Sequence, residues 1–272
     1  MTSYFRVLEI DDNNCFGSLG VANVLCEYNK VHEAKEIYKL LGQSEPDSLA
    51  GQHAMLNHAH LLMWEGNYEF AINLYQTCYE KAQQCSGSSH GSRSSNATKE
   101  IAMFLAKALF KKKDYTACKK ITVTLMVKHP EDLRLKYNLA VCLHEESSMI
   151  FTLGIRKVKQ TLHAIQSLKQ AKSLLISMSA LVKSAGVLGH SAFWSANSEQ
   201  LCTEQNRKLI VDNYEHIREK AVELLSGITS QLDSSDYYLQ HDRDFELKAL
   251  MKMQEREQLQ QQEKEKQKRN TE

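Results

Sequence analysis

Residues 59–78, AHLLMWEGNYEFAINLYQTC, contain a pattern of small and large side chains that recurs along the chain. The small residues Ala59 and Ala71 are each followed by a large one, Leu62 and Tyr75, three or four positions later. The same spacing occurs earlier in Ala22, Leu25, Ala34, Tyr38, Leu41 and Pro46, and later in Leu105, Ala106, Leu109, Tyr115, Cys118, Leu125 and Pro130. Both prolines of the chain therefore stand at the same place in a repeated unit.

With short insertions set aside, the units repeat every 34 residues in the pattern of the tetratricopeptide repeat (TPR), a pair of helices A and B. Small residues at positions 8 and 20 of a unit let its two helices approach closely, and large residues at positions 11, 17 and 24 fill the groove between them. Proline at position 32 ends helix B. We therefore predict an all-α fold, a TPR solenoid wound as a right-handed superhelix and followed by long C-terminal helices.

The composition agrees with a helical protein whose cysteines are free thiols. Two prolines and 11 glycines in 272 residues leave few turn signals for a sheet protein. The 34 basic and 33 acidic residues nearly cancel, so no net field steers the chain toward nucleic acid or anionic lipid. Seven cysteines without a C-x-x-C pair indicate buried thiols. Because the N-terminus has no signal-peptide pattern and no long apolar run occurs, we expect neither secretion nor a membrane span.

The repeat register divides the chain into segments. Residues 1–14 have the pattern of the end of a truncated unit, so we expect either the C-terminal piece of a longer solenoid or a shortened gene model. Residues 15–183 form the predicted solenoid, with a flexible Ser-rich insertion at 85–97 and a degenerate last unit. In that unit Ser147–Gly154 is expected to interrupt the helices before a long helix at Arg156–Lys183. A flexible insertion (184–198), a long helix (199–232) and a charged single helix or disordered tail (234–272) follow.

The predicted binding surface is the concave wall that helices A form with positions 2, 5, 9, 12 and 13. Its aromatic, Met and charged residues have the composition of a site for an extended peptide of another protein. The alternative is that the chain's own tail helix covers part of this wall. The candidate residues are Asn23, Glu27, Leu56, His60, Trp64, Met103, Lys107, Lys111, Arg134, Tyr137 and His144.

No catalytic or nucleotide-binding motif is found, so we expect neither an enzyme nor a small-molecule substrate or cofactor. His53, His58 and His60 do not share one helix face and have no further ligand at suitable spacing, which argues against a metal site. A carboxylate clamp of the chaperone-binding TPR type is also excluded. Asn23 and Asn57 match its pattern, but the remaining clamp positions hold Leu19, Glu100 and Phe104.

The order of features resembles one family in particular. The runs 104–120 (FLAKALFKKKDYTACKK) and 137–143 (YNLAVCL), an interrupted last unit, a lone long helix and a Glu/Lys/Gln tail together resemble the C-terminal part of the large TPR scaffold subunit of the RNA polymerase II-associated factor (Paf) complex. The insertions at 85–97 and 184–198 are not expected of that family, and its N-terminal repeats are absent here.

The resemblance implies a non-catalytic nuclear scaffold that binds other Paf-complex subunits and the RNA polymerase II elongation complex. It also implies a role in transcription elongation and in the histone modification that accompanies it. The alternative is a generic cytoplasmic TPR adaptor that binds an extended peptide or helix of another protein. Direct nucleic-acid binding by the tail is not expected, because its acidic and basic residues are equal in number.

Overall fold

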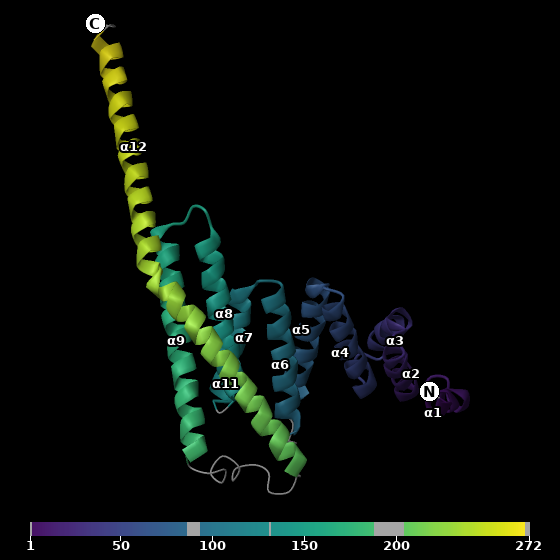
Figure 1. The fold of residues 1–272 in the computed structure, drawn as a ribbon. Helices are drawn as coiled ribbons and strands as arrows, with labels where there is room; N and C mark the ends of the chain where they lie inside the picture. Colours follow the sequence, from purple (N-terminus) through teal and green to yellow (C-terminus); the bar gives the residue numbers. More distant parts are fainter. Residues whose placement is uncertain (1, 86–92, 131, 188–203, 270–272) are drawn as a thin grey trace. The chain divides into compact units, whose positions relative to one another are not determined.

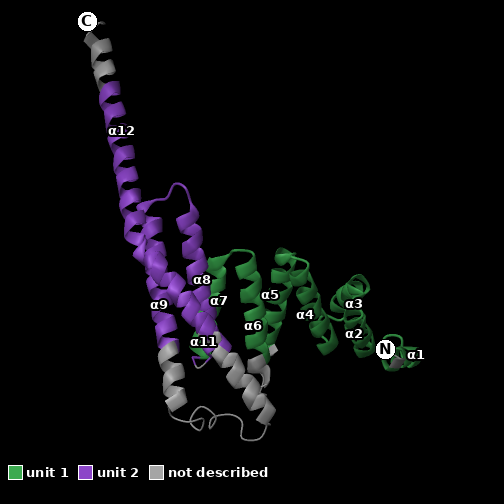
Figure 2. Ribbon diagram, viewed as in Figure 1, with its two compact units in different colours: residues 1–129 green, residues 130–272 purple. Residues whose placement is uncertain are grey.

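The computed structural model describes residues 2–85, 93–130, 132–187 and 204–269, and all regular secondary structure in these ranges is α-helical. The predicted all-α fold is therefore confirmed. The chain divides into two compact units, residues 1–129 and 130–272 (Figures 1 and 2). In the described ranges, no helix combines the length and the apolar character that crossing a membrane requires.

The first unit is a succession of helices in which each packs against the next along the chain (Figure 1). Three helix pairs, α2–α3, α4–α5 and α6–α7, are each joined by a short turn, as helices A and B of a TPR are, and α1 packs on α2. The helices are α1 (Thr2–Ile10), α2 (Cys15–Glu27), α3 (Val31–Ser44), α4 (Leu49–Trp64), α5 (Tyr68–Cys85), α6 (Arg93–Lys111) and α7 (Tyr115–Lys128).

The turn between the two helices of each pair has the same backbone conformation. Asn29, Gly66 and Lys113 all stand at position 15 of their units and all have positive φ, at 60°, 80° and 67°. The next amide closes the same hydrogen bond in each case: Lys30 N–H donates to Leu25, Asn67 N–H to Leu62 and Asp114 N–H to Leu109. This left-handed residue with a bond back across the last turn is the Schellman ending of a helix. The repetition therefore extends to the backbone of the turns.

Side chains of the preceding segments cap the following helices. Asn14 Oδ1 accepts from Gly17 N–H at 2.9 Å, Ser48 Oγ from Gly51 N–H at 2.9 Å, and Asp114 Oδ1 from Ala117 N–H at 3.0 Å. Each cap satisfies an amide that has no partner within its own helix. The boundaries of α2, α4 and α7 are therefore set by local sequence.

The core of the first unit includes the residues that the repeat pattern places at its small and large positions. Ala22 and Ala59 at position 8 and Ala34 and Ala71 at position 20 are fully buried, as close helix packing requires. Tyr38 and Tyr75, both at position 24, are almost fully buried. One cluster joins α2, α3 and α4 through Leu19, Val21, Ala22, Leu25, Ala34, Tyr38, Leu41, Ala50 and Ala54.

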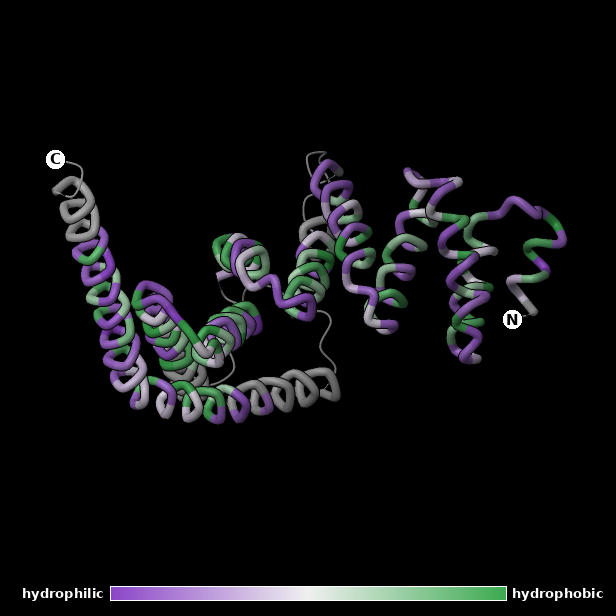
Figure 3. Tube along the Cα trace, turned by 90° about the horizontal axis from the view of Figure 1, so that it is seen from above, coloured by the Kyte–Doolittle hydropathy of each residue, from purple (hydrophilic) through white to green (hydrophobic). Residues whose placement is uncertain are grey.

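The second unit consists of α8 (Leu133–Thr152), α9 (Val158–Val187), α11 (Glu204–Asp233) and α12 (Ser235–Arg269). Helices α8 and α9 form a pair, and α11 and α12 both pack on α9. Figure 1 shows α12 continuing beyond the ends of α8 and α9. The side chains of residues 243–260 are all exposed, and hydrophilic residues are frequent along this C-terminal helix in Figure 3.

The expected interruption at Ser147–Gly154 is wrong for residues 147–152, which continue α8 as helix. Ser147 stands at position 15, where the other units turn, but it is fully buried. Its hydroxyl donates to Leu143 O within α8 and lies 3.1 Å from Ala164 O on α9. The turn is displaced to residues 153–157, because the hydroxyl of Ser147 holds this residue within the α8–α9 pair.

Three expected boundaries also differ. The predicted solenoid of residues 15–183 is divided after His129, because α8 and α9 form a compact unit with α11 and α12. Of the insertion 85–97, residues 93–97 already belong to α6, and residues 184–187 of the second insertion belong to α9. The structure does not describe residues 86–92 and 188–203. These ranges contain the rest of both insertions and the start of the predicted helix 199–232.

Candidate partner-binding face

Eight of the predicted binding residues belong to the first unit. Helix α2 carries Asn23 and Glu27, α4 carries Leu56, His60 and Trp64, and α6 carries Met103, Lys107 and Lys111. On each of these helices the residues are four positions apart, so they lie along one face. Helix α2 packs on α4, and ring contacts join α4 to α6. We call these eight residues the α2–α4–α6 face.

Asn23 is at the centre of a polar contact that joins three helices. Its Oδ1 accepts from the Tyr38 hydroxyl on α3 at 2.7 Å and from Asn57 Nδ2 on α4 at 3.0 Å. Burial raises the pKa of Tyr38 above its ordinary value, so this hydroxyl keeps its proton and donates. The side chain of Asn23 is therefore oriented by both of its neighbours and does not move freely on the surface.

His60 occupies the corresponding place in the next unit. Its Nδ1 and the Tyr75 hydroxyl on α5 share a hydrogen bond of 2.7 Å, and its ring lies 4.5 Å edge-on from the ring of Phe104 on α6. Tyr75 and Phe104 in turn stack at 6.1 Å. In both units a residue at position 9 therefore contacts a tyrosine at position 24 of its own unit and a residue at position 6 of the next.

Tyr38, Tyr75, Asn57 and Phe104 were not among the predicted binding residues. The repeat pattern treats position 24 as core, and nothing in the spacing shows that its hydroxyl reaches position 9. The available signal was that tyrosine recurs at position 24 in the two units whose position 9 holds an amide or an imidazole, Asn23 and His60. The third unit has Thr122 there, whose hydroxyl instead donates to Cys118 O.

The charges on this face are unevenly distributed. Burial lowers the pKa of His60, and the nearby Lys107 charge lowers it further, so the imidazole is neutral at pH 7. The acidic side chain, Glu27, is on α2, whereas Lys107 and Lys111 are both on α6. Within the described residues neither lysine forms an ion pair. Trp64 on α4 is 74% exposed.

The other three predicted binding residues belong to the second unit and have local contacts there. Arg134 is bound to Asp132, the N-cap of its own helix, with Nη2 2.8 Å from Oδ2. Burial raises the pKa of the half-buried Tyr137, and the Glu223 charge on α11 raises it further, which places Tyr137 near α11. His144 Nδ1 is buried and lies 3.6 Å from Glu145 Oε1. These contacts of Arg134 and Tyr137 lie within their own unit.

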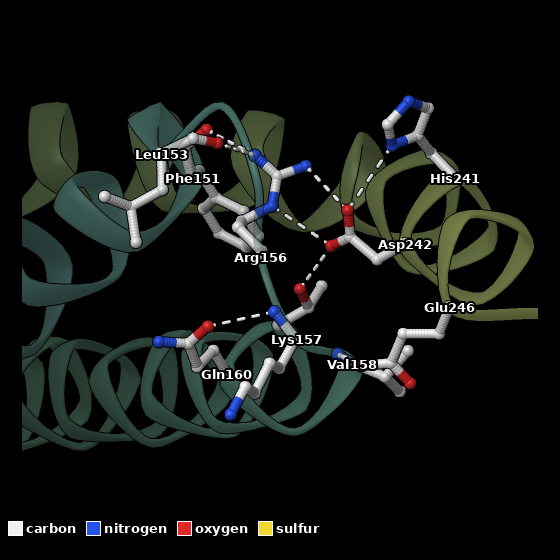
Figure 4. A network of polar contacts seen from close by, with 10 residues as sticks. Phe151, Leu153, Arg156, Lys157, Val158, Gln160, His241, Asp242 and Glu246 are labelled. Carbon is white, nitrogen blue, oxygen red and sulfur yellow. Dashed lines mark hydrogen bonds and ion pairs between the residues drawn. The ribbon is translucent and has the colours of Figure 1, made fainter. Parts of the chain in front are cut away.

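The second unit also contains a buried polar network that the sequence did not indicate (Figure 4). Arg156 Nε and Nη2 donate to Asp242 Oδ2 and Oδ1 at 3.0 and 3.2 Å, and its Nη1 donates to the carbonyls of Phe151 and Leu153 at 2.8 and 2.9 Å. The Thr161 hydroxyl also donates to Asp242. The network joins the α8–α9 connection to α12 and leaves little of either charged group exposed.

Burial by itself would raise the pKa of Asp242. The hydrogen bonds from Arg156, Thr161 and His241, with the charge of Arg156, outweigh this effect and hold the pKa below its ordinary value. The Tyr238 ring lies 5.1 Å from the guanidinium carbon of Arg156 and stacks on Phe151. Because every group in the network already has partners, the role of the network is structural, and it holds α12 against the α8–α9 connection.

The described residues do not bring together three His, Cys, Asp or Glu side chains as a metal site would require. His58 and His60 on α4 illustrate why. His60 faces Tyr75 and Phe104, whereas the pKa of His58 is lowered by burial and then by Lys35 and Lys39 of α3. The two imidazoles therefore face different neighbouring helices.

Comparison with known proteins finds a distant relative by sequence. No protein-family model matches this chain. "Protein CTR9 homolog" of Arabidopsis thaliana is 22% identical over 166 residues, which are 60% of this chain and 14% of that protein, so the chain spans only a small part of this relative. Among solved structures, residues 41 to the end of MamA from Desulfovibrio magneticus RS-1 align with a TM-score of 0.42 and 12% identity, over 82% of this chain and 97% of that one. YrrB, described as a TPR protein with an unusual peptide-binding site, aligns with a TM-score of 0.42 and 13% identity, over 89% and 97%.

Proposed function

We propose that this chain is a non-catalytic TPR scaffold of the Paf complex, which binds other subunits and the RNA polymerase II elongation complex in the nucleus. In this role it supports transcription elongation and the histone modification coupled to it. The observation that carries the proposal is the match of 166 residues to Protein CTR9 homolog. The repeat order and the long helices after the repeats, which resemble the Paf scaffold subunit, support the same proposal.

The geometry of the first unit is consistent with a binding role. Asn23 and His60 are held in place by buried tyrosines, while Glu27, Trp64, Lys107 and Lys111 remain exposed on the same succession of helices. Oriented polar groups next to an exposed aromatic side chain are the usual composition of a protein-binding site. We assign partner binding to the α2–α4–α6 face and leave Arg134, Tyr137 and His144 as further candidate contacts in the second unit.

The test is affinity purification of the tagged full chain from nuclear extract, followed by identification of the bound proteins. The expected result is co-purification of Paf subunits and RNA polymerase II. Recovery of chaperones or transport proteins without either would contradict the proposal and favour the cytoplasmic adaptor. Fluorescence localisation of the same tagged chain separates the two functions independently, because the scaffold is expected in the nucleus and the adaptor in the cytoplasm.

A further inference from the structure

The α4 and α6 parts of the α2–α4–α6 face combine an exposed aromatic side chain with uncompensated positive charge. Lys107 and Lys111 are one helical turn apart on α6, where two like charges repel each other. Within the described residues neither has an acidic partner. By contrast Lys112, in the turn directly after α6, is paired with Glu69 at 2.8 Å. Two neighbouring lysines without a partner leave positive charge available to a ligand.

Two contacts give the register between α4 and α6. The rings of His60 and Phe104 meet at 4.5 Å, and Lys107 is near enough to His60 to lower its pKa. Both helices are the first of their pairs and so run in the same direction. The same register places Trp64, one turn after His60, at the level of residue 108, between Lys107 and Lys111. The indole and the two ammonium groups therefore belong to one patch.

The rest of the face restricts the ligand further. Asn57 Nδ2 donates to Asn23 Oδ1 at 3.0 Å, so Glu27, one turn after Asn23 on α2, lies at the level of residue 61. Glu27 is therefore beside α4, on the side away from α6. The face thus carries an acidic group on α2, apolar and aromatic groups on α4 (Leu56 and Trp64), and basic groups on α6. Glu100, the acidic residue earlier on this side of α6, already has contacts of its own.

We propose that this face binds an extended acidic peptide segment of another protein, with an apolar side chain of the segment on Trp64 and its carboxylates on Lys107 and Lys111. The inference rests on the binding role proposed above and specifies its partner. Packed helices lie about 8–10 Å apart, and an extended chain advances about 3.3 Å per residue. The acidic residues are therefore expected about three positions from the apolar one. Carboxylates placed toward α2 would be repelled by Glu27, which gives the bound segment a direction.

The chain's own tail is a poorer occupant. Residues 243–260 of α12 carry acidic and basic residues in alternation along a helix, not an acidic block in extended conformation. Helix α12 packs on α9 and α11. A neutral helix of mixed charge does not complement a face whose charge changes from acidic on α2 to basic on α6.

The experiment is selection of a random peptide library on the full chain, with three versions compared: the natural chain, Lys107→Glu with Lys111→Glu, and Lys120→Glu. Lys120 is an exposed lysine of α7 outside the face and serves as the matched control. Circular dichroism of each version confirms that it is folded. The natural chain and Lys120→Glu are expected to select peptides with Asp or Glu about three positions from an aromatic or aliphatic residue, and the double variant is expected not to select them.

A synthetic peptide of the selected consensus then gives affinities by fluorescence anisotropy. The double variant is expected to bind it about tenfold more weakly, and Lys120→Glu unchanged. Trp64→Ala is also expected to weaken binding. Selection of no peptide, selection without acidic residues, or equal affinity in the double variant would overturn the inference. A single-stranded RNA oligonucleotide of the same charge serves as a competitor ligand. If the natural chain binds it more tightly than the peptide and the double variant does not bind it, the inference is overturned in favour of nucleic acid.

The two proposals fail separately. If the natural chain co-purifies with Paf subunits and shows no preference for acidic peptides, the ligand assignment is wrong and the scaffold function stands. If it selects acidic peptides but co-purifies with neither Paf subunits nor polymerase, the face is correctly assigned and the Paf function is wrong.

Discussion

Arg156 and Asp242 are 86 positions apart in the sequence, and their side chains form a two-point ion pair in the second unit, with Nε–Oδ2 and Nη2–Oδ1 distances of 3.0 and 3.2 Å. Asp242 is only 3% exposed. The remaining guanidinium nitrogen donates to the carbonyls of Phe151 and Leu153, so the pair also closes the connection between α8 and α9. Because both charges are removed from water, each depends on the other.

Arg156→Met is expected to lower the free energy of unfolding by about 3–5 kcal/mol, because it leaves the Asp242 carboxylate buried without its cation. Chemical denaturation followed by circular dichroism measures this loss. Arg243→Met, a change at a neighbouring exposed arginine, is the control and is expected to cost less than about 0.5 kcal/mol. The double variant Arg156→Met with Asp242→Leu should regain part of the loss. Equal effects of Arg156→Met and Arg243→Met would show that the buried pair does not stabilise this unit.

The same pair predicts an acid-sensitive contribution to stability. The pKa of Asp242 is lower in the folded chain than in the unfolded one, where it is about 3.9. The stabilisation is therefore fully present above that value and is lost as the pH falls through the folded pKa. Unfolding midpoints measured from about pH 6 to about pH 3 should decline more steeply for the natural chain than for Asp242→Asn. The exposed control Asp244→Asn should follow the natural chain, and a slope for Asp242→Asn as steep as the natural one would refute this assignment.

Tyr75→Phe removes the hydroxyl that satisfies Nδ1 of His60 at 2.7 Å. We expect it to cost about 1–3 kcal/mol, since a half-buried ring nitrogen is left without its partner. Tyr38→Phe should behave similarly, because it removes the 2.7 Å bond to Asn23 Oδ1. Tyr28→Phe, at a tyrosine that is 68% exposed, is the matched control and should be close to neutral. Thermal unfolding ranks the stabilities of the three variants. If Tyr75→Phe leaves the stability unchanged, the hydrogen bond between Tyr75 and His60 makes no net contribution to it.

The common turn conformation at position 15 predicts changes of opposite sign in two units. Gly66→Ala is expected to destabilise by about 1 kcal/mol, because Gly66 has φ of 80°, where an L-residue is strained. Lys113→Gly is expected to stabilise by up to about 1 kcal/mol, because it removes that strain at φ of 67°. Gly227→Ala, within α11 and with open space around the added methyl group, controls for the general effect of alanine and should stabilise. Changes of the same sign at positions 66 and 113 would contradict the shared turn geometry, and differential scanning calorimetry measures all three.

The sequence predicted the positions of the candidate binding face but not the contacts that orient its side chains. The spacing of Asn23, His60 and Lys107 predicted three equivalent positions, and in the structure each lies on the first helix of its pair. The tyrosine contacts that orient Asn23 and His60 were not predictable, because a hydroxyl at position 24 can serve the core without any polar partner. For Arg134 and Tyr137 the repeat register gave the helix correctly. The contact of Arg134 with Asp132 is local to the start of α8, whereas the proximity of Tyr137 to α11 depends on the packing of the second unit.

The sequence by itself determined the helix pairs, because small and large side chains at a fixed period decide how two neighbouring helices pack, and the caps and turns between them are local. Only the tertiary structure decided where the fourth pair turns and how α12 is held. Ser147 stands at the repeat's turn position but stays helical because its hydroxyl bonds Leu143 O and contacts α9. Arg156 and Asp242 both lie outside the repeat pattern, so no periodicity in the sequence connects them. Their pairing follows from burial, which leaves each charge with the other as its main partner.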